Sequence, residues 1–257
     1  MIEDLMDRNE KIMITSVKNE KVKEWRKLHK RKGRTVSGTF LVEGYHLVEE
    51  AWKSGWKVKE IILAESADMP SWAKEMPIES VTASVFQHIS QTETPQGIAA
   101  VVHMAAFEKI EGDFLVLIDS IQDPGNLGTI IRTADAAGVD GIVIGKGTVD
   151  LFNDKVLRST QGSVFHLPVV QKELLEFIPR IQKDGFQVLA TALENAVEYT
   201  EVGTIGKTAV MLGNEGAGVN EGLLSLADKI VHIPIYGQAE SLNVSVAAGI
   251  LMYHLRS

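Results

Sequence analysis

Residues 233–255, IPIYGQAESLNVSVAAGILMYHL, form the stretch around which the rest of the chain is organised. Its second half, Leu242 to Leu255, is apolar on nearly every side, and such a helix is buried on more than one face. Those fourteen residues would rise only about 21 Å, too short for a bilayer core of roughly 30 Å. A polar cluster that includes Ser241, the predicted N-cap, precedes the helix and suggests a binding site. Taken alone, however, the segment fits an ordinary C-terminal core helix better.

Upstream of this stretch, short apolar runs alternate with helical segments. The runs are Phe114–Ile118, Gly141–Ile144, Phe186–Ala190, Thr208–Leu212 and Ile230–Ile235. Continuous apolar strands that alternate with helices indicate an α/β domain whose mostly parallel sheet is covered on both faces.

The first part of the chain predicts a second, smaller α/β unit. A helix is expected from Phe40 to about Lys53, and β-branched runs predict strands at Val58–Ala64, Ile78–Thr82 and Ile98–His103. Residues 104–113 lack periodicity and form the expected linker. The expected domains are therefore a basic helical extension over residues 1–35, a small domain over 36–104 and a larger one over 112–257.

Charge is segregated along the 257 residues, which carry a net charge of −8. Residues 18–34 contain nine Lys or Arg and two acids, a charge of +7, so the remaining residues sum to −8 − 7 = −15. We expect a basic helix from Val17 to Lys32, stopped by Gly33. Such a segment either offers a surface to a polyanion or is merely solvated, and the sequence leaves both open.

Other features bound the class of protein. There is no cysteine, no apolar run long enough for a membrane, and no apolar leader at the N-terminus, so a cytoplasmic protein is expected. The seven histidines are scattered without the spacing of metal ligands, so no metal site is predicted.

Three polar loops each follow a predicted strand, where the ligand site of a parallel sheet lies. The first, residues 119–126, leads into a helix that Asn126 is predicted to cap and on which Arg132 lies off the apolar stripe. The second is Gly213–Gly218, and the third is residues 236–243. The glycine order of the second loop, G-x-x-G-x-G, is a poor dinucleotide signature, which disfavours an oxidoreductase.

Together these loops resemble the three motifs of the SpoU/TrmH-type RNA 2′-O-ribose methyltransferases of the SPOUT superfamily. The motif N-L-G-x-x-x-R is present as Asn126–Arg132, G-x-E-G as Gly213–Gly216 and S-L-N-V-S-V-A as Ser241–Ala247. The resemblance covers about residues 112–257. Residues 36–104, with Val42-Glu43-Gly44 and Pro95-Gln96-Gly97, resemble the separate L30e-like substrate-binding domain of rRNA-modifying members.

This resemblance implies a deep trefoil knot, a homodimer formed through the knotted domain, and S-adenosylmethionine as the cofactor. It assigns the catalytic group to Asn126, Arg132, Glu215, Ser241 and Asn243. It assigns the cofactor contacts to Leu212, Gly213, Asn214, Gly216, Ile233, Ile235 and Leu242. Whether Arg132 is a general base or a positioning group stays open, because a guanidinium is a poor base.

The resemblance therefore implies an enzyme that methylates a ribose 2′-OH of structured RNA. Ribosomal RNA is favoured because of the separate N-terminal domain. A tRNA methyltransferase and a catalytically inactive RNA-binding protein of the same fold remain as alternatives. DNA is excluded if the chemistry is right, since it lacks the 2′-OH.

Overall fold

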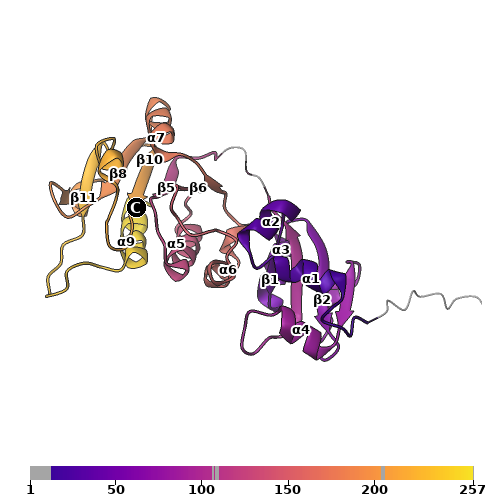
Figure 1. Ribbon diagram of the computed structural model, residues 1–257. Helices are drawn as coiled ribbons and strands as arrows, with labels where there is room; N and C mark the ends of the chain where they lie inside the picture. The colour runs from indigo at the N-terminus through magenta and orange to yellow at the C-terminus, as the bar shows by residue number, and fades with distance from the viewer. Residues whose placement is uncertain (1–12, 106, 108–109, 204–205, 257) are drawn as a thin grey trace, which may run out of the picture. The chain divides into compact units, whose positions relative to one another are not determined.

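The computed structural model describes residues 13–105, 107, 110–203 and 206–256. The chain folds as two compact units, Met1–Met104 and Ala105–Ser257 (Figure 1).

The first unit contains a four-stranded sheet in the order β1-β4-β2-β3. The strands are β1 (Thr39–Glu43), β2 (Val58–Ala64), β3 (Ile78–Val81) and β4 (Ile98–His103). β4 pairs antiparallel with β1 and β2, and β3 pairs parallel with β2. The helices are α1 (Glu20–Lys27), α2 (Arg31–Ser37), α3 (Tyr45–Lys53), η1 (Ser71–Ala73) and α4 (Ala83–Ile89).

Two predictions for this unit are wrong. The stretch expected to be a helix from Phe40 begins as strand β1. α3 starts only after Gly44, whose positive φ of +96° allows the backbone to turn between the strand and the helix. The single helix expected from Val17 to Lys32 is two helices, α1 and α2, separated at residues 28–30, and Gly33 does not stop the second of them. It lies inside α2, where a Cβ would stand 2.0 Å from the carbonyl oxygen of Lys27. The glycine therefore permits close approach of α2 to the end of α1.

The second unit contains a seven-stranded sheet in the order β7-β6-β5-β10-β8-β11-β9, and its recorded strand pairs are all parallel. The strands are β5 (Phe114–Ile118), β6 (Gly141–Ile144), β7 (Val169–Gln171), β8 (Gln187–Thr191), β9 (Val197–Glu198), β10 (Thr208–Leu212) and β11 (Lys229–His232). The prediction of a mostly parallel sheet is confirmed.

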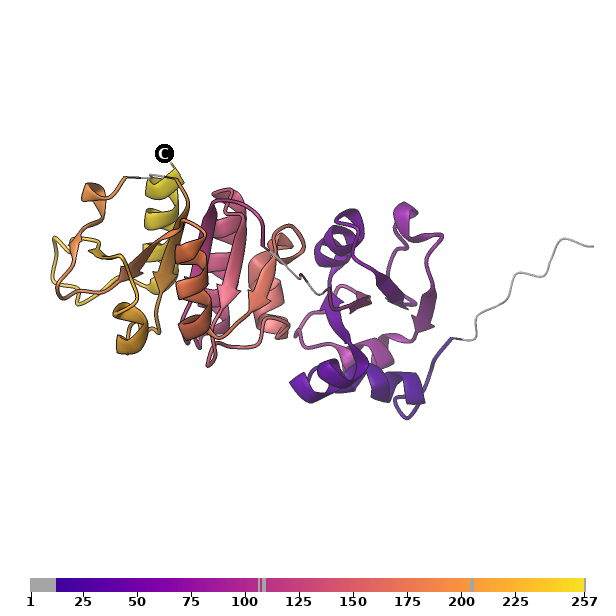
Figure 2. The ribbon, with the colours of Figure 1, turned by 90° about the horizontal axis from the view of Figure 1, so that it is seen from above.

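Both faces of this sheet are covered by helices, as expected. The helices are α5 (Pro124–Ala136), α6 (Asp154–Thr160), η2 (Ser163–Phe165), α7 (Leu174–Lys183), η3 (Tyr199–Glu201), α8 (Glu221–Leu224) and α9 (Val244–Arg256). Alternate residues of β5 enter two core clusters, one shared with α5 and α9 and the other with α7 and α8. Figures 1 and 2 show α5 and α9 side by side against the sheet.

Two helix caps differ from the predictions. Asp123 caps α5, because its carboxylate accepts a hydrogen bond from the backbone N–H of Asn126, which lies in the first turn. Asn243 rather than Ser241 precedes α9 and accepts from the backbone N–H of Ser245. The trefoil knot stays a prediction. Among the described residues, no helix is both long enough and apolar enough to span a membrane.

Candidate functional site

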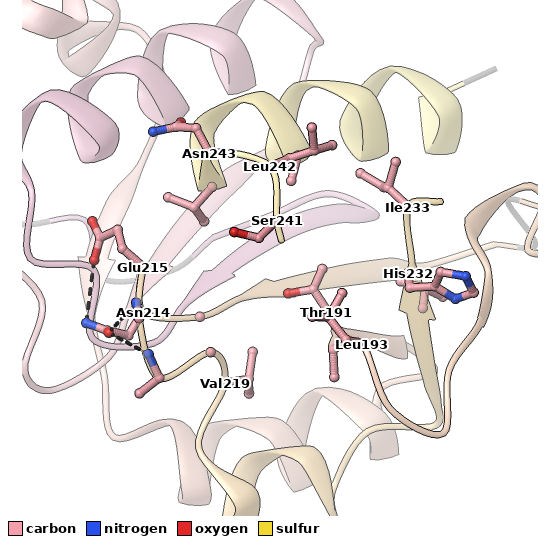
Figure 3. Close-up of a pocket in the computed structure, with 18 of the residues that line it drawn as sticks. Thr191, Leu193, Asn214, Glu215, Val219, His232, Ile233, Ser241, Leu242 and Asn243 are labelled. Atoms are coloured by element: carbon pink, nitrogen blue, oxygen red, sulfur yellow. Dashed lines mark hydrogen bonds between the residues drawn. The ribbon is translucent and has the colours of Figure 1, made fainter. Parts of the chain in front are cut away.

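A cavity of about 610 Å³ lies beyond the carboxyl ends of β8, β10 and β11 (Figure 3). Its wall is formed by residues 191–194, 213–219, parts of 231–235, and residues drawn from 240–251. Ligand cavities for small molecules have volumes of about 300–1,000 Å³. The second and third loops predicted from the sequence thus meet at one ligand-sized cavity.

Asn214 holds the loop after β10 in a closed turn. Its side-chain oxygen accepts hydrogen bonds from the backbone N–H groups of Gly216 and Ala217, at 2.9 and 3.0 Å. Its amide nitrogen donates to the carbonyl oxygen of Ser120, at 2.8 Å. The backbone of Asn214 also pairs with that of Gly218 in both directions. The turn is therefore fixed to the first loop as well as to itself.

The carboxylate of Glu215 joins the second loop to the first. It accepts hydrogen bonds from the backbone N–H groups of Gln122 and Asp123, at 3.2 and 3.1 Å, and from the side-chain amide of Asn126, at 3.1 Å. The side-chain oxygen of Asn126 accepts in turn from the amide of Asn243, at 2.9 Å. One hydrogen-bonded chain therefore links the three predicted motifs.

The pKa of Glu215 reflects this arrangement. Partial burial pushes the pKa upward, but the hydrogen bond from Asn126 and those from backbone N–H groups outweigh it, so the pKa lies below its ordinary value of 4.5. The carboxylate is consequently charged at neutral pH, which is the form that accepts all these bonds.

This carboxylate gives a pH-dependent prediction. A group with a lowered folded-state pKa stabilises the fold above its unfolded pKa, and this contribution is lost as the pH falls through the folded-state value. Glu215→Gln offers one acceptor oxygen where the wild type uses two. We expect the melting temperature of Glu215→Gln to lie below that of the wild type at pH 7. The difference should shrink as the pH falls below about 4.5. Thermal unfolding from pH 3 to 7 measures it, and a difference that grows in acid would contradict the assignment.

The charges around the cavity limit what it can bind. Three glutamates, Glu194, Glu215 and Glu240, line it, and the described lining residues include no lysine or arginine. A pyrophosphate would meet these carboxylates without a counter-charge, whereas a ligand with a sulfonium and an ammonium group would be attracted. The cavity therefore suits a cationic small molecule better than a dinucleotide.

Six of the seven predicted cofactor contacts line the cavity, and Leu212 does not. The cavity wall includes Gly213, Asn214, Gly216, Ile233, Ile235 and Leu242. Leu212 is not among the lining residues: it is fully buried at the end of β10, where its carbonyl oxygen accepts from the backbone N–H of Asp119. Of the predicted catalytic residues, Glu215, Ser241 and Asn243 line the cavity, and Asn126 is hydrogen-bonded to two of them.

Arg132 is the predicted catalytic residue that the structure does not bring to this group. It lies on the exposed side of α5, six residues after Asn126 and about 9 Å further along the helix axis. It is not a lining residue of the cavity, and no hydrogen bond or ion pair to the described residues is recorded for it. Its guanidinium is thus available to a group outside the cavity.

Sequence reasoning missed the segment Thr191–Glu194, which lines the cavity after β8. The signal was present, because Phe186–Ala190 was predicted as a strand and its carboxyl end lies at the same edge as those of the other strands. A cluster of side chains able to hold a metal ion is absent from the described part of the chain.

Family models match both units. The model of the SpoU rRNA Methylase family matches residues 113–253, and that of an MRM3-like substrate binding domain matches residues 19–100. The second match includes α1 and α2, which the sequence had placed mostly outside the N-terminal domain.

Over nearly its whole length the chain is similar to proteins named as rRNA methyltransferases. It is 50% identical to the 23S rRNA (guanosine(2553)-2'-O)-methyltransferase RlmP of Bacillus subtilis, over 95% of this chain and 98% of that protein. It is 30% identical to a 23S rRNA (uridine(2479)-2'-O)-methyltransferase of Streptomyces viridochromogenes, over 93% of this chain and 90% of that protein. A crystal structure of an AdoMet-bound rRNA methyltransferase from Sinorhizobium meliloti matches with a TM-score of 0.85 and 33% identity, covering 95% of this chain and 96% of that one.

Proposed function

The chain belongs to the SpoU rRNA methylase family, and from that premise we propose that it methylates a ribose 2′-OH of 23S rRNA with S-adenosylmethionine. We propose further that the target is the guanosine equivalent to the one named for the Bacillus subtilis relative. The observation that carries this proposal is the 50% identity to that relative, which extends over both units and not the catalytic one alone. A substrate-binding unit that is similar throughout supports the same RNA substrate.

The cavity fits the cofactor. Its volume, its three glutamates and its lack of described lysine or arginine suit S-adenosylmethionine, which carries a net positive charge. The cofactor supplies a methyl group on a sulfonium when bound. The turn held by Asn214 leaves backbone groups of residues 213–218 beside the cavity, where they can bind the cofactor without a charged side chain.

The hydrogen-bonded group Asn126, Glu215 and Asn243 positions the loops around the reacting atoms. Glu215 and Asn126 fix the first loop against the second, and Asn243 fixes the start of α9 to both. Alignment of two reactants can supply several kcal/mol of a displacement barrier. Arg132 would orient the phosphate beside the target ribose or stabilise the developing alkoxide. Ser241, exposed on the cavity wall, would face the ribose.

A homodimer is proposed because α9 has an exposed apolar face. Val246 and Tyr253 are 51% and 56% exposed, and Gly249 and Ile250 fall on the same side at helical spacing. Leu242, 36% exposed, lies just before the helix. A stripe of this kind on a helix that is otherwise buried against α5 suits a symmetric contact between two copies. Such a dimer would also bring the Arg132 of one copy towards the cavity of the other.

The dimer is tested by charge introduced on this face. We expect Val246→Glu/Tyr253→Glu to be monomeric, because two carboxylates would be buried without a partner at a symmetric contact. Light scattering after size-exclusion chromatography measures the mass. Leu175→Glu, on α7 and 52% exposed, is the matched control and should leave the wild-type mass unchanged. A double variant that keeps the wild-type mass would remove α9 from the interface.

The proposed function is tested by transfer of a labelled methyl group to unmodified RNA. We expect incorporation into a 23S rRNA transcript and none into a transfer RNA pool. Incorporation into transfer RNA alone would favour a tRNA methyltransferase. No incorporation into either, with S-adenosylmethionine still bound, would favour an inactive RNA-binding protein of the same fold. Since the substrate is ribosomal, the cytoplasm is the proposed compartment.

A further inference from the structure

The basic segment of residues 18–34 spans α1, α2 and the turn between them, and seven of its nine cations fall into two sets. In the first set, Lys21 pairs with Glu60 and Glu79, at 3.4 and 2.9 Å, and Lys23 pairs with Glu20, at 2.6 Å. Arg26 lies 2.9 Å from Nε2 of His88. Arg34 is only 4% exposed and donates to the carbonyl oxygen of Leu28, at 2.7 Å. These four are therefore occupied within the protein.

The second set gathers where α1 turns into α2. Lys27, Lys30 and Lys32, here called the turn lysines, are exposed, and no hydrogen bond or ion pair of their side chains with the described residues is recorded. The backbone N–H of Lys30 donates to the carbonyl oxygen of Lys27, which closes a reverse turn and keeps their Cα atoms within about 7 Å. Gly33 closely approaches the backbone of Lys27. The first turn of α2, which carries Lys32, therefore packs against the end of α1 at Lys27.

The backbone that carries the turn lysines is packed firmly against the first unit. Val22, Trp25 and Leu28 are buried in the core that includes β2, β4 and α4. The indole N–H of Trp25 donates to Glu60, at 3.0 Å, and the Arg34–Leu28 bond closes the turn from the inside. Lysines on a preformed scaffold lose little conformational freedom of the backbone when they bind a ligand. A flexible basic tail would not have this property.

We propose that the turn lysines bind backbone phosphates of the RNA substrate. This rests on the proposed function, because it takes RNA as the polyanion. Three neighbouring positive charges whose side chains form no recorded ion pair with the described residues match the closely spaced phosphates of a nucleic acid. The remainder of the chain carries −15, so the excess positive charge that favours RNA is concentrated in this segment. An acidic protein surface would offer fewer and more widely spaced charges, so RNA is favoured.

The test compares two triple variants of the full-length protein. The first is Lys27→Gln/Lys30→Gln/Lys32→Gln. The matched control is Lys57→Gln/Lys59→Gln/Lys74→Gln, which removes three exposed lysines of the same unit. Binding of an unmodified 23S rRNA transcript is measured over a range of salt concentrations, together with S-adenosylmethionine affinity and kcat at saturating RNA. Glutamine preserves helix propensity, so both variants should fold, and thermal unfolding checks this.

Each phosphate contact contributes about −0.7 to −0.9 to the slope of log K against log salt. We expect the turn-lysine variant to flatten this slope by about 2 and to weaken RNA binding roughly 10- to 100-fold near 0.1 M salt. Its kcat and its S-adenosylmethionine affinity should stay at the wild-type values. Equal slopes and affinities for the two triple variants would overturn the proposal. Because binding is measured directly, the result can be read even if the wild type fails to methylate this RNA.

Discussion

Arg132→Ala should abolish methylation while leaving the affinity for S-adenosylmethionine within a few-fold of the wild type. Arg132 does not line the cavity and has no recorded hydrogen bond or ion pair to the described residues, so its loss should not disturb the cofactor site. A charged group aimed at a developing alkoxide or at the adjacent phosphate stabilises the transition state, and loss of one such donor lowers kcat by about 100- to 1,000-fold. Calorimetry and the labelled-methyl assay measure the two quantities.

The matched control for this variant is Arg180→Ala, which removes an exposed arginine of α7. It should keep full activity. Arg132→Lys should recover only part of the activity, because an ammonium cannot make the planar, two-pronged contact of a guanidinium with a phosphate. Loss of cofactor binding together with methylation in Arg132→Ala would assign Arg132 a structural role instead.

Gly213→Val should eliminate S-adenosylmethionine binding. A Cβ at Gly213 would stand 2.2 Å from the carbonyl carbon of Gly218 and 2.2 Å from the backbone nitrogen of Val219. Both are main-chain atoms of the turn that lines the cavity, so the turn itself would have to move. Displacement by about 1 Å at a preorganised site can cost 100-fold, and we expect at least that loss of affinity by calorimetry.

Gly237→Ala is the matched control for Gly213→Val. It lies in the third loop, where a Cβ would meet no atom within 4 Å. Its cofactor affinity should equal that of the wild type. If Gly213→Val binds the cofactor normally while remaining folded, the turn of residues 213–218 does not form the cofactor site.

Arg132 on α5 and Gly213 after β10 allow a test of a shared active site. If Arg132 acts in the cavity of the partner copy, co-expression of Arg132→Ala with Gly213→Val gives mixed dimers that each contain one intact site. Since half of a random population is mixed, about a quarter of the wild-type activity should return. If both groups act within one copy, every site in the mixed dimer lacks one of them and activity stays absent.

The sequence predicted the large sheet well because its strands are continuous apolar runs. Phe114–Ile118, Gly141–Ile144 and Thr208–Leu212 agree with the structure residue for residue. Strands buried on both faces appear in a sequence as continuous hydrophobic runs, which are easily recognised. The two-residue strand Val197–Glu198 has no such hydrophobic run, and its Val197 is exposed, so the sequence did not predict it.

Glycines and caps were the main source of error. Gly44 separates β1 from α3 with a positive φ, whereas Gly33 lies within a helix and serves a tertiary contact, and sequence alone does not distinguish these uses. At the start of α5, by contrast, a signal was overlooked. Proline favours the first helical position, so Pro124 pointed to Asp123 as the cap and left the side chain of Asn126 available for Glu215.

The site was predictable in part. The rule that ligands bind at the carboxyl ends of parallel strands predicted that the second and third loops lie at one edge of the sheet. In the structure, hydrogen bonds among Glu215, Asn126 and Asn243 also connect these loops to the first loop. The bond between Asn126 and Glu215 spans 89 positions of the sequence, so no local pattern could predict it. The role of Arg132 could not be predicted in the same way, because the groups proposed to contact it, the RNA and a second copy, are not part of the single chain.

The most direct test of the account is to locate the transferred methyl group. After reaction with a 23S rRNA transcript, the RNA is hydrolysed in alkali, which cleaves through the free 2′-OH, and the products are analysed by mass spectrometry. We expect one alkali-resistant dinucleotide that carries the label on the ribose of a guanosine. A label on a base, or the absence of a resistant dinucleotide despite methyl transfer, would contradict it.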